Sequence, residues 1–318
     1  MYGFRAKTVE LGGDVTLQVP TMQEYAEDPD WDIIVCGTSN LKEAVQQVAE
    51  EHPDQKVILY DAQDEKGLPN VFSMDHCQNE GAYLAGVAAA LLTTSEAPLA
   101  NAEKTVGFVG GGENTALDDY LIGYIQGVHS VDEDINILVS WIGDFKDTAK
   151  GKELAVAQAG QGADVIFSVA GIAGLGTLAG CAESNIYSIG VDSAQSTVLL
   201  EPDPTTAANI CTAMYKKADV TVSTLIAKAL DDTLEWAATL SGVCRTAWLA
   251  WQPITPTIRA SSPRSRRAIW RVCRRTLPPE SWRSCPPLVW TTISCSRSWL
   301  PQPSKDNIGN RTRLRSVP

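Results

Sequence analysis

The sequence predicts an α/β protein with two doubly wound parallel sheets, and three observations lead to that fold class. Short continuous runs of Val and Ile alternate with amphipathic helical patterns, at a spacing of roughly 30 residues that is typical of parallel strands covered by helices on both faces. The alternation restarts after the Ala- and Pro-containing stretch at 95–104, which indicates a boundary near 100–105. Glycines and acids also follow several strands at their carboxyl ends, where open α/β sheets collect ligands.

The apolar runs and helical periods give the expected elements in chain order. Strands are expected at 15–21, 30–37, 56–62, 70–76, 105–112, 135–143, 163–171, 186–192 and 197–201. Helices are expected at 40–52, 80–92, 115–131, 147–162, 177–184 and 205–232. The first of these helices has Ser39 or Asn40 as a suitable N-cap, and its apolar residues recur at helical spacing.

Charge divides the chain in two at about residue 243. Up to Gly242 there are 12 Lys and Arg against 36 Asp and Glu, whereas the remainder has 14 against 2. The segment 243–318 also holds six of the nine Trp, ten of the seventeen Pro and four of the eight Cys, without a sustained helical or strand period.

Three interpretations of this tail compete. Arg and Trp suit a nucleic-acid-binding segment, and a disordered linker is the second interpretation, although its Trp and Cys content argues against it. The third is that 243–318 is translated out of frame, because GC-rich DNA in a shifted frame yields Arg, Pro, Ser, Trp and Cys. We favour the third interpretation and expect an aberrant, disordered tail.

The acidic body argues against nucleic acid or an anionic membrane as its partner. No stretch is apolar for 18 residues, and the first residues, "MYGFRAKTVELGGD", show neither a signal peptide nor a lipid-attachment Cys. The Cys residues of the body are widely spaced and form no CxxC pair, and we expect them to be buried thiols. No metal or cofactor site is predicted.

The residues at the strand ends carry the functional signal. Asp61 and Asp192 each end an apolar strand, and glycines follow others, at 110–112 and at Gly171. Acids accept hydrogen bonds from hydroxyls, while glycines allow close approach to the backbone. The run "GFVGGGENTAL" resembles a phosphate loop but lacks the GK[ST] signature and has acids at its end. This set therefore favours a neutral, polyhydroxylated ligand over a phosphate.

Five ordered strings in the body resemble the basic membrane protein family. They are "NVFSMDHCQNEGAYLAGVAAAL", "TVGFVGGG", "GDFKDTAKGKELA", "GADVIFSVAGIAGLG" and "IGVDSAQ", and the resemblance covers about residues 3–236. Members of this family are substrate-binding lipoproteins of ABC importers and include purine nucleoside receptors.

The resemblance implies a type I periplasmic-binding-protein fold, in which two lobes close on a ligand. The first lobe would comprise 1–103 plus 204–236, and the second 104–203. By the resemblance, Phe145 stacks on the base, Gly171 offers its backbone, Asp192 accepts from ribose hydroxyls and Lys216 completes the polar set. Asp61 matches an acid near the crossover between the lobes. Asp192 and Lys216 are expected to neutralise one another as the cleft closes.

The chain also departs from the family pattern. The family's first strand, signal peptide and lipidated Cys have no counterpart here, and Ala213 and Ala194 replace a Ser and an acid. We therefore expect an incomplete first lobe and an incomplete gene product.

The function expected is capture of a purine nucleoside by a monomeric, non-enzymatic receptor that delivers it to ABC permease subunits. The family's location is extracytoplasmic and membrane-anchored. The alternatives are a ligand-sensing regulatory domain on the same fold, a nonfunctional truncated copy and, least favoured, a flavodoxin-like or Rossmann enzyme.

Overall fold

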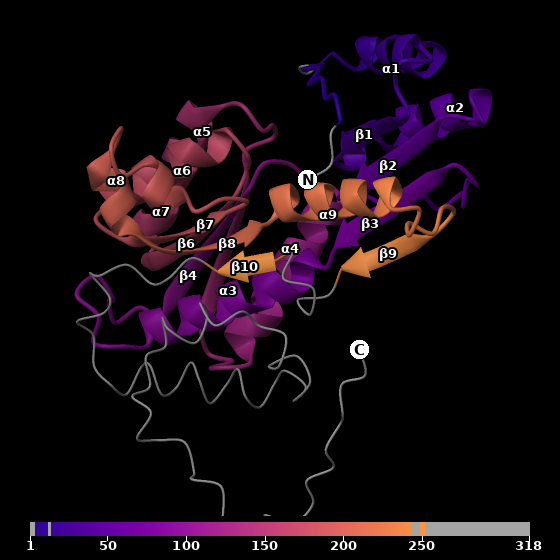
Figure 1. Ribbon diagram of the computed structural model, residues 1–318. Helices are drawn as coiled ribbons and strands as arrows, with labels where there is room; N and C mark the ends of the chain where they lie inside the picture. Colours follow the sequence, from indigo (N-terminus) through magenta and orange to yellow (C-terminus); the bar gives the residue numbers. More distant parts are fainter. Residues whose placement is uncertain (1–3, 12–13, 243–248, 252–318) are drawn as a thin grey trace, which may run out of the picture.

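The computed structural model describes residues 4–11, 14–242 and 249–251, arranged as two α/β lobes (Figure 1). The strands are β1 Ile33–Gly37, β2 Lys56–Tyr60, β3 Val71–His76, β4 Thr105–Gly110, β5 Asn136–Trp141, β6 Ala163–Val169, β7 Tyr187–Val191, β8 Ile210–Lys216, β9 Thr239–Gly242 and β10 Leu249–Trp251. The helices are α1 Gln18–Glu27, α2 Lys42–Glu51, α3 Gln78–Thr93, α4 Thr115–His129, α5 Thr148–Gly160, α6 Ala173–Glu183, α7 Gln195–Val198, α8 Pro204–Asn209 and α9 Ala218–Leu230. Two 3-10 turns, η1 Val15–Leu17 and η2 Ser39–Leu41, precede α1 and α2.

The first sheet has the strand order β1-β2-β3-β9, and all its pairs are parallel. Side chains alternate between its two faces. Val57 and Leu59 pack with residues of α1 and α2, whereas Ile58 packs with Leu225 of α9 on the opposite face. Both faces are therefore covered, as the continuous apolar runs predict.

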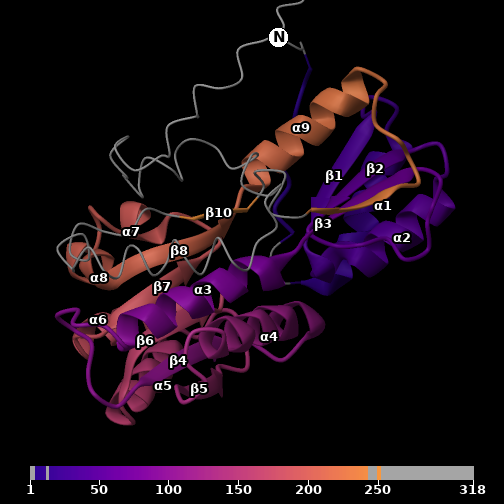
Figure 2. The ribbon, with the colours of Figure 1, turned by 90° about the horizontal axis from the view of Figure 1, so that it is seen from below.

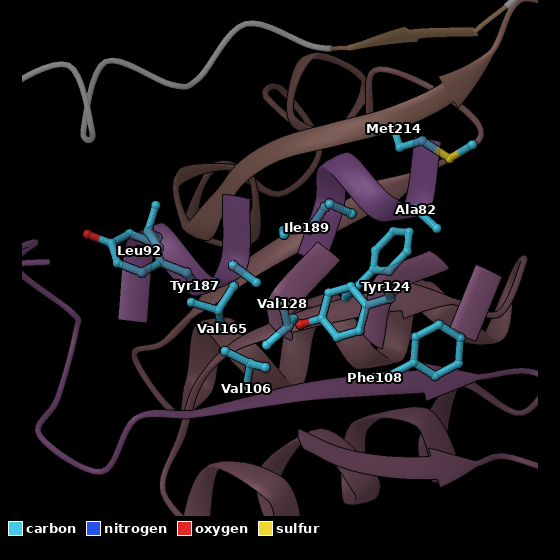
Figure 3. Close-up of a cluster of buried hydrophobic side chains, with 14 of the residues drawn as sticks. Ala82, Leu92, Val106, Phe108, Tyr124, Val128, Val165, Tyr187, Ile189 and Met214 are labelled. Atoms are coloured by element: carbon cyan, nitrogen blue, oxygen red, sulfur yellow. The ribbon is translucent and has the colours of Figure 1, made fainter. Parts of the chain in front are cut away.

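The second sheet has the order β10-β8-β7-β6-β4-β5 and is parallel except for β10. Val165 of β6 lies in a cluster with residues of α3 and α4 (Figure 3), to which Phe167 of the same strand also belongs. Ile166 packs instead toward Ala155 of α5 and Cys181 of α6. Strands β4, β6 and β7 are buried along their whole length. This sheet confirms the predicted doubly wound arrangement.

Helix α3 packs in the second lobe, although the boundary expected near 103 places it in the first. It lies beside α4 against the second sheet (Figure 2). Glycines allow the close approach, because a Cβ at Gly86, Gly123 or Gly127 would collide with backbone carbonyl oxygens of the neighbouring helix. The chain therefore first crosses from the first lobe to the second at residues 76–78, where β3 ends and α3 begins.

The helix expected over 205–232 is wrong in its central part. Residues Ile210–Lys216 form β8, which pairs with β7 in the interior of the second sheet. A continuous apolar run fits either a buried helix or a buried strand, so pairing with β7 decides. Residues 204–216 therefore belong to the second lobe, and only α9 and β9 return to the first.

Three smaller expectations also differ. The strand expected at 15–21 is η1 and the start of α1, where Asp14 accepts a hydrogen bond from the Thr16 amide. The strand expected at 197–201 is the end of the short helix α7 and a turn. Within the tail expected to be disordered, β10 pairs with β8; residues 243–248 and 252–318 lie outside the described residues.

No helix in the described parts of the chain is long and apolar enough to cross a bilayer.

The glycine contacts between α3 and α4 lead to a stability prediction. Gly127→Ala places a methyl group against the Tyr83 carbonyl, and we expect a loss of about 2 kcal/mol in the free energy of unfolding, as for overpacking of a core. Urea unfolding followed by circular dichroism measures this change. Gly160→Ala is the matched control, since a Cβ there has open space in the last turn of α5. It is expected to change stability by no more than about 1 kcal/mol, and equal effects of the two substitutions would contradict the close-packing account.

Candidate functional site

A cavity of about 240 Å³ lies between the lobes, at the carboxyl ends of strands from both sheets. It is lined by Thr38, Ser39, Asn40, Asp61, Gln78, Asn114, Ala116, Leu117, Tyr120, Phe145, Val169, Gly171, Asp192 and Lys216. All five residues named from the sequence are in this set. The structure therefore brings together Asp61 of the first lobe with Phe145, Gly171, Asp192 and Lys216 of the second.

A larger hollow of about 340 Å³ lies elsewhere, between the N-terminal segment and α1. Arg5 and Lys7 occupy its walls and lie over the rings of Trp31 and Tyr25, 4.9 Å from each ring centre. No residue at the carboxyl end of a strand lines it. The smaller cavity between the lobes is therefore the candidate site.

An ion pair between Asp61 and Lys216 crosses the cavity floor and joins the two lobes. The Lys216 Nζ lies 2.7 and 2.9 Å from the two carboxylate oxygens, and the side chains are only 14% and 19% exposed for Lys216 and Asp61. Lys216 is the last residue of β8, so its position depends on that strand and not on a helix face. Lys216 was expected to neutralise Asp192, but in the structure it forms its ion pair with Asp61.

The pKa values of this pair show that both groups remain charged. Burial acts to raise the pKa of Asp61, but the hydrogen bond from His76 and the charge of Lys216 outweigh it and hold that pKa below its usual range. Burial also disfavours the charged form of Lys216, yet Tyr120 and Asp61 outweigh it and raise the pKa of Lys216. Each charge therefore offsets the desolvation of the other.

Both acids at the cavity occupy an uncommon backbone conformation. Asp61 has φ 59° and Asp192 has φ 63°, in the left-handed region that residues other than glycine seldom adopt. Each lies one residue after a parallel strand, at the point where the chain turns out of its sheet. Such conformations cluster at functional sites, where the surrounding structure fixes them.

Asp192 differs from Asp61 in its surroundings. Its side chain is exposed to solvent, and among the described residues its carboxylate has no hydrogen-bond or ion-pair partner. The protein around the concave wall nevertheless displaces much of its hydration, which raises the pKa of Asp192, and the charge of Lys216 opposes this effect. Its carboxylate is therefore available as an acceptor for ligand hydroxyls.

Phe145 supplies the aromatic wall of the cavity. A Cβ at Gly111 would come within 2.5 Å of the Phe145 ring, and one at Gly171 would lie 3.6 Å from it, so the ring rests against glycine backbone. Gly171 also has φ +55°, which favours glycine. The Phe145 carbonyl accepts a hydrogen bond of 3.0 Å from the Ala173 amide at the start of α6. The residue is 40% exposed and lines the cavity, so part of the ring is open to a ligand.

Several residues at this site were not found from the sequence. Tyr120 is buried on α4, and Lys216 Nζ lies 5.4 Å from its ring centre. His76 ends β3 and lies 3.0 Å from Asp61 through its Nδ1. The strand-end position of His76 is a signal that sequence reasoning can use, whereas Tyr120 resembles any apolar helix residue. Among the described residues, no group of three or more His, Cys, Asp or Glu is placed to bind a metal.

The interlobe ion pair generates a prediction about stability and pH. Because the folded pKa of Asp61 is depressed, the pair stabilises the fold above the ordinary carboxyl pKa, and this contribution is lost as the pH falls through the folded value. Lys216→Met leaves the Asp61 charge partly buried without its cation, and we expect a loss of about 3 kcal/mol at pH 7. Urea unfolding at pH 7 and pH 3 should show that the deficit narrows in acid. A deficit that is independent of pH would mean that the lysine contributes through packing alone.

The chain is similar in sequence to two curated bacterial proteins. It is 34% identical over 185 residues to the ABC transporter nucleoside-binding protein BmpA of Lactococcus lactis subsp. cremoris, which covers 55% of this chain and 50% of that protein. It is 35% identical over 151 residues to the CD4+ T-cell-stimulating antigen of Listeria monocytogenes, covering 47% of this chain and 40% of the antigen. The chain thus matches half or less of the length of these curated relatives.

The fold is also found in solved structures. An ABC transporter solute-binding protein from Aeropyrum pernix K1 superimposes with a TM-score of 0.66 at 21% identity, over 89% of this chain and 79% of that one. This likeness confirms the two-lobed fold of type I periplasmic binding proteins. The family model described as "ABC transporter substrate-binding protein PnrA-like" matches residues 7–241. Because that span includes well over half of the sequence and both sides of the cavity, the chain belongs to this family, Bmp.

Proposed function

We propose that this chain is a receptor that captures a purine nucleoside between its lobes and delivers it to an ABC permease. The observation that carries the proposal is that the Phe145 ring, the Lys216 ammonium and the Asp192 carboxylate, which has no partner among the described residues, converge on one cavity. A flat base and a sugar with two hydroxyls need such a set. The name of the Lactococcus relative supports the same class of ligand.

Each residue has a distinct role in the proposed capture. Phe145 stacks on the base, an interaction worth about 1–3 kcal/mol per base in single-stranded nucleic-acid complexes. Asp192 accepts hydrogen bonds from the ribose hydroxyls, and Lys216, held by Asp61, donates to a sugar oxygen. Gly171 brings its backbone close to the ligand. The cavity volume of about 240 Å³ is slightly below the roughly 300–1,000 Å³ of sites for drug-sized ligands, so the cavity suits one small molecule.

The proposed mechanism is binding without chemical change. The ligand contacts residues of both lobes, so it favours the closed arrangement by its differential affinity for that state. Closure then presents a surface that permease subunits recognise. In this proposal the receptor acts outside the cytoplasm and is anchored to the membrane through lipid, as its family implies.

Calorimetry against adenosine, guanosine and inosine tests the proposed ligand class. We expect at least one nucleoside to bind, and we expect Phe145→Ala and Asp192→Ala each to weaken the affinity by about tenfold or more, equivalent to about 1.4 kcal/mol. Val156→Ala on α5 and Glu201→Gln are the matched controls, since both side chains are exposed and neither lines the cavity. If both cavity variants bind as the wild type does, the assignment of the site is wrong.

A second test compares the binding of a charged nucleotide with that of the neutral nucleoside. The charged groups lining the cavity are Asp61, Asp192 and Lys216, and the lysine is already paired. A phosphate dianion therefore meets an excess of negative charge, and we expect guanosine 5′-monophosphate to bind at least about tenfold more weakly than guanosine. Competition calorimetry at fixed ionic strength measures the ratio. Tighter binding of the nucleotide would identify a phosphate site instead.

A further inference from the structure

Asp61 has a second partner, His76, to which the proposed capture assigns no role. The imidazole Nδ1 lies 3.0 Å from Asp61 Oδ1, and Nε2 lies 3.4 Å from the hydroxyl oxygen of Thr221 on α9. When Thr221 donates to Nε2, Nδ1 carries the proton and donates to the Asp61 carboxylate. Both ring nitrogens are then satisfied.

His76 is placed to act on the site without touching a ligand. Its side chain is 1% exposed, and it is not among the residues that line the cavity. It is the last residue of β3, where the chain crosses to α3 in the second lobe, while Lys216 ends β8, where the chain crosses back to α9. The Asp61 carboxylate therefore binds one side chain from each of these two crossovers.

We propose that His76 is a positioning residue that fixes the Asp61 carboxylate and, through it, holds the Lys216 ammonium at the cavity. This inference rests on the proposed function, because it takes Lys216 to be a ligand contact. Two of the four lone-pair directions of Asp61 are directed to Lys216 by its two hydrogen bonds, and His76 supplies a donor at a third. Without His76, the carboxylate is free to turn about its last bond, and Lys216 moves with it.

The charged and titratable groups that face Asp61 come from both lobes. They are Tyr60, Asp75, His76, Tyr120, Asp192 and Lys216. Burial acts to raise the pKa of Asp61, and only the His76 hydrogen bond and Lys216 lower it. Removing the donor from His76 therefore raises the pKa of Asp61.

Two isosteric variants separate positioning from packing. The amide nitrogen of His76→Asn occupies the place of Nδ1 and keeps the donor to Asp61. The amide of His76→Gln reaches the place of Nε2 and keeps only the contact with Thr221. With the nucleoside that the wild type binds, we expect His76→Gln to weaken the affinity by about tenfold and His76→Asn to restore it to within about threefold of the wild type.

A double-mutant cycle tests whether His76 acts through Asp61. If it does, His76→Gln added to Asp61→Asn weakens binding no further than Asp61→Asn alone. Additive losses, or equal losses in the Asn and Gln variants, would overturn the proposal. Circular dichroism melting of each variant verifies that the comparison is made between folded proteins.

The ligand-free protein provides a measurement that does not depend on the proposed function. As the pH falls from 7 to 3, the wild type loses the Asp61 contribution to stability only at the depressed folded pKa, whereas His76→Gln should lose it at a higher pH. The urea midpoint of His76→Asn should follow the wild-type profile. If no nucleoside binds but these profiles differ as expected, the proposed function fails and the positioning role stands; if a nucleoside binds and the profiles coincide, the positioning role fails.

Discussion

The ion pair between Asp61 and Lys216 is the constraint on which the cavity depends. It joins the carboxyl end of β2 in the first sheet to the carboxyl end of β8 in the second, at 2.7 and 2.9 Å. If either residue lost its partner, the remaining partly buried charge would lower the stability of the fold, so each residue stabilises the position of the other. The pair thereby fixes how the two sets of strand ends face each other.

The packing of α3 against α4 builds the other side of the same cavity. Glycines on both helices bring their backbones close together, which fixes α3 in the second lobe although it follows β3 of the first. Gln78 at the start of α3 and Asn114 before α4 then line the cavity together. The packing of α3 against α4 thus helps to determine which polar groups reach the cavity.

The walls of the cavity are prepared in different ways. The Phe145 ring rests on glycine backbone and is partly exposed, and its loop is held by Asp144 and Asp147, which accept hydrogen bonds from backbone amides. Asp192 has a left-handed backbone conformation, and among the residues that the structure describes its carboxylate has no hydrogen-bond or ion-pair partner. Asp61, by contrast, accepts hydrogen bonds from both His76 and Lys216. The proposed capture of a nucleoside depends on these three differently held side chains.

The sequence by itself determined the α/β class, most of the strands and the family, because buried parallel strands are continuous apolar runs and strand-end residues are local in sequence. It also identified Asp61, Phe145, Gly171, Asp192 and Lys216, all of which line one cavity. Only the tertiary structure decided that 210–216 is a strand, since an apolar run fits helix or strand until a neighbouring strand pairs with it. The same holds for the partner of Lys216 and for His76, because contacts 155 and 15 residues apart in the chain leave no periodic trace in the sequence.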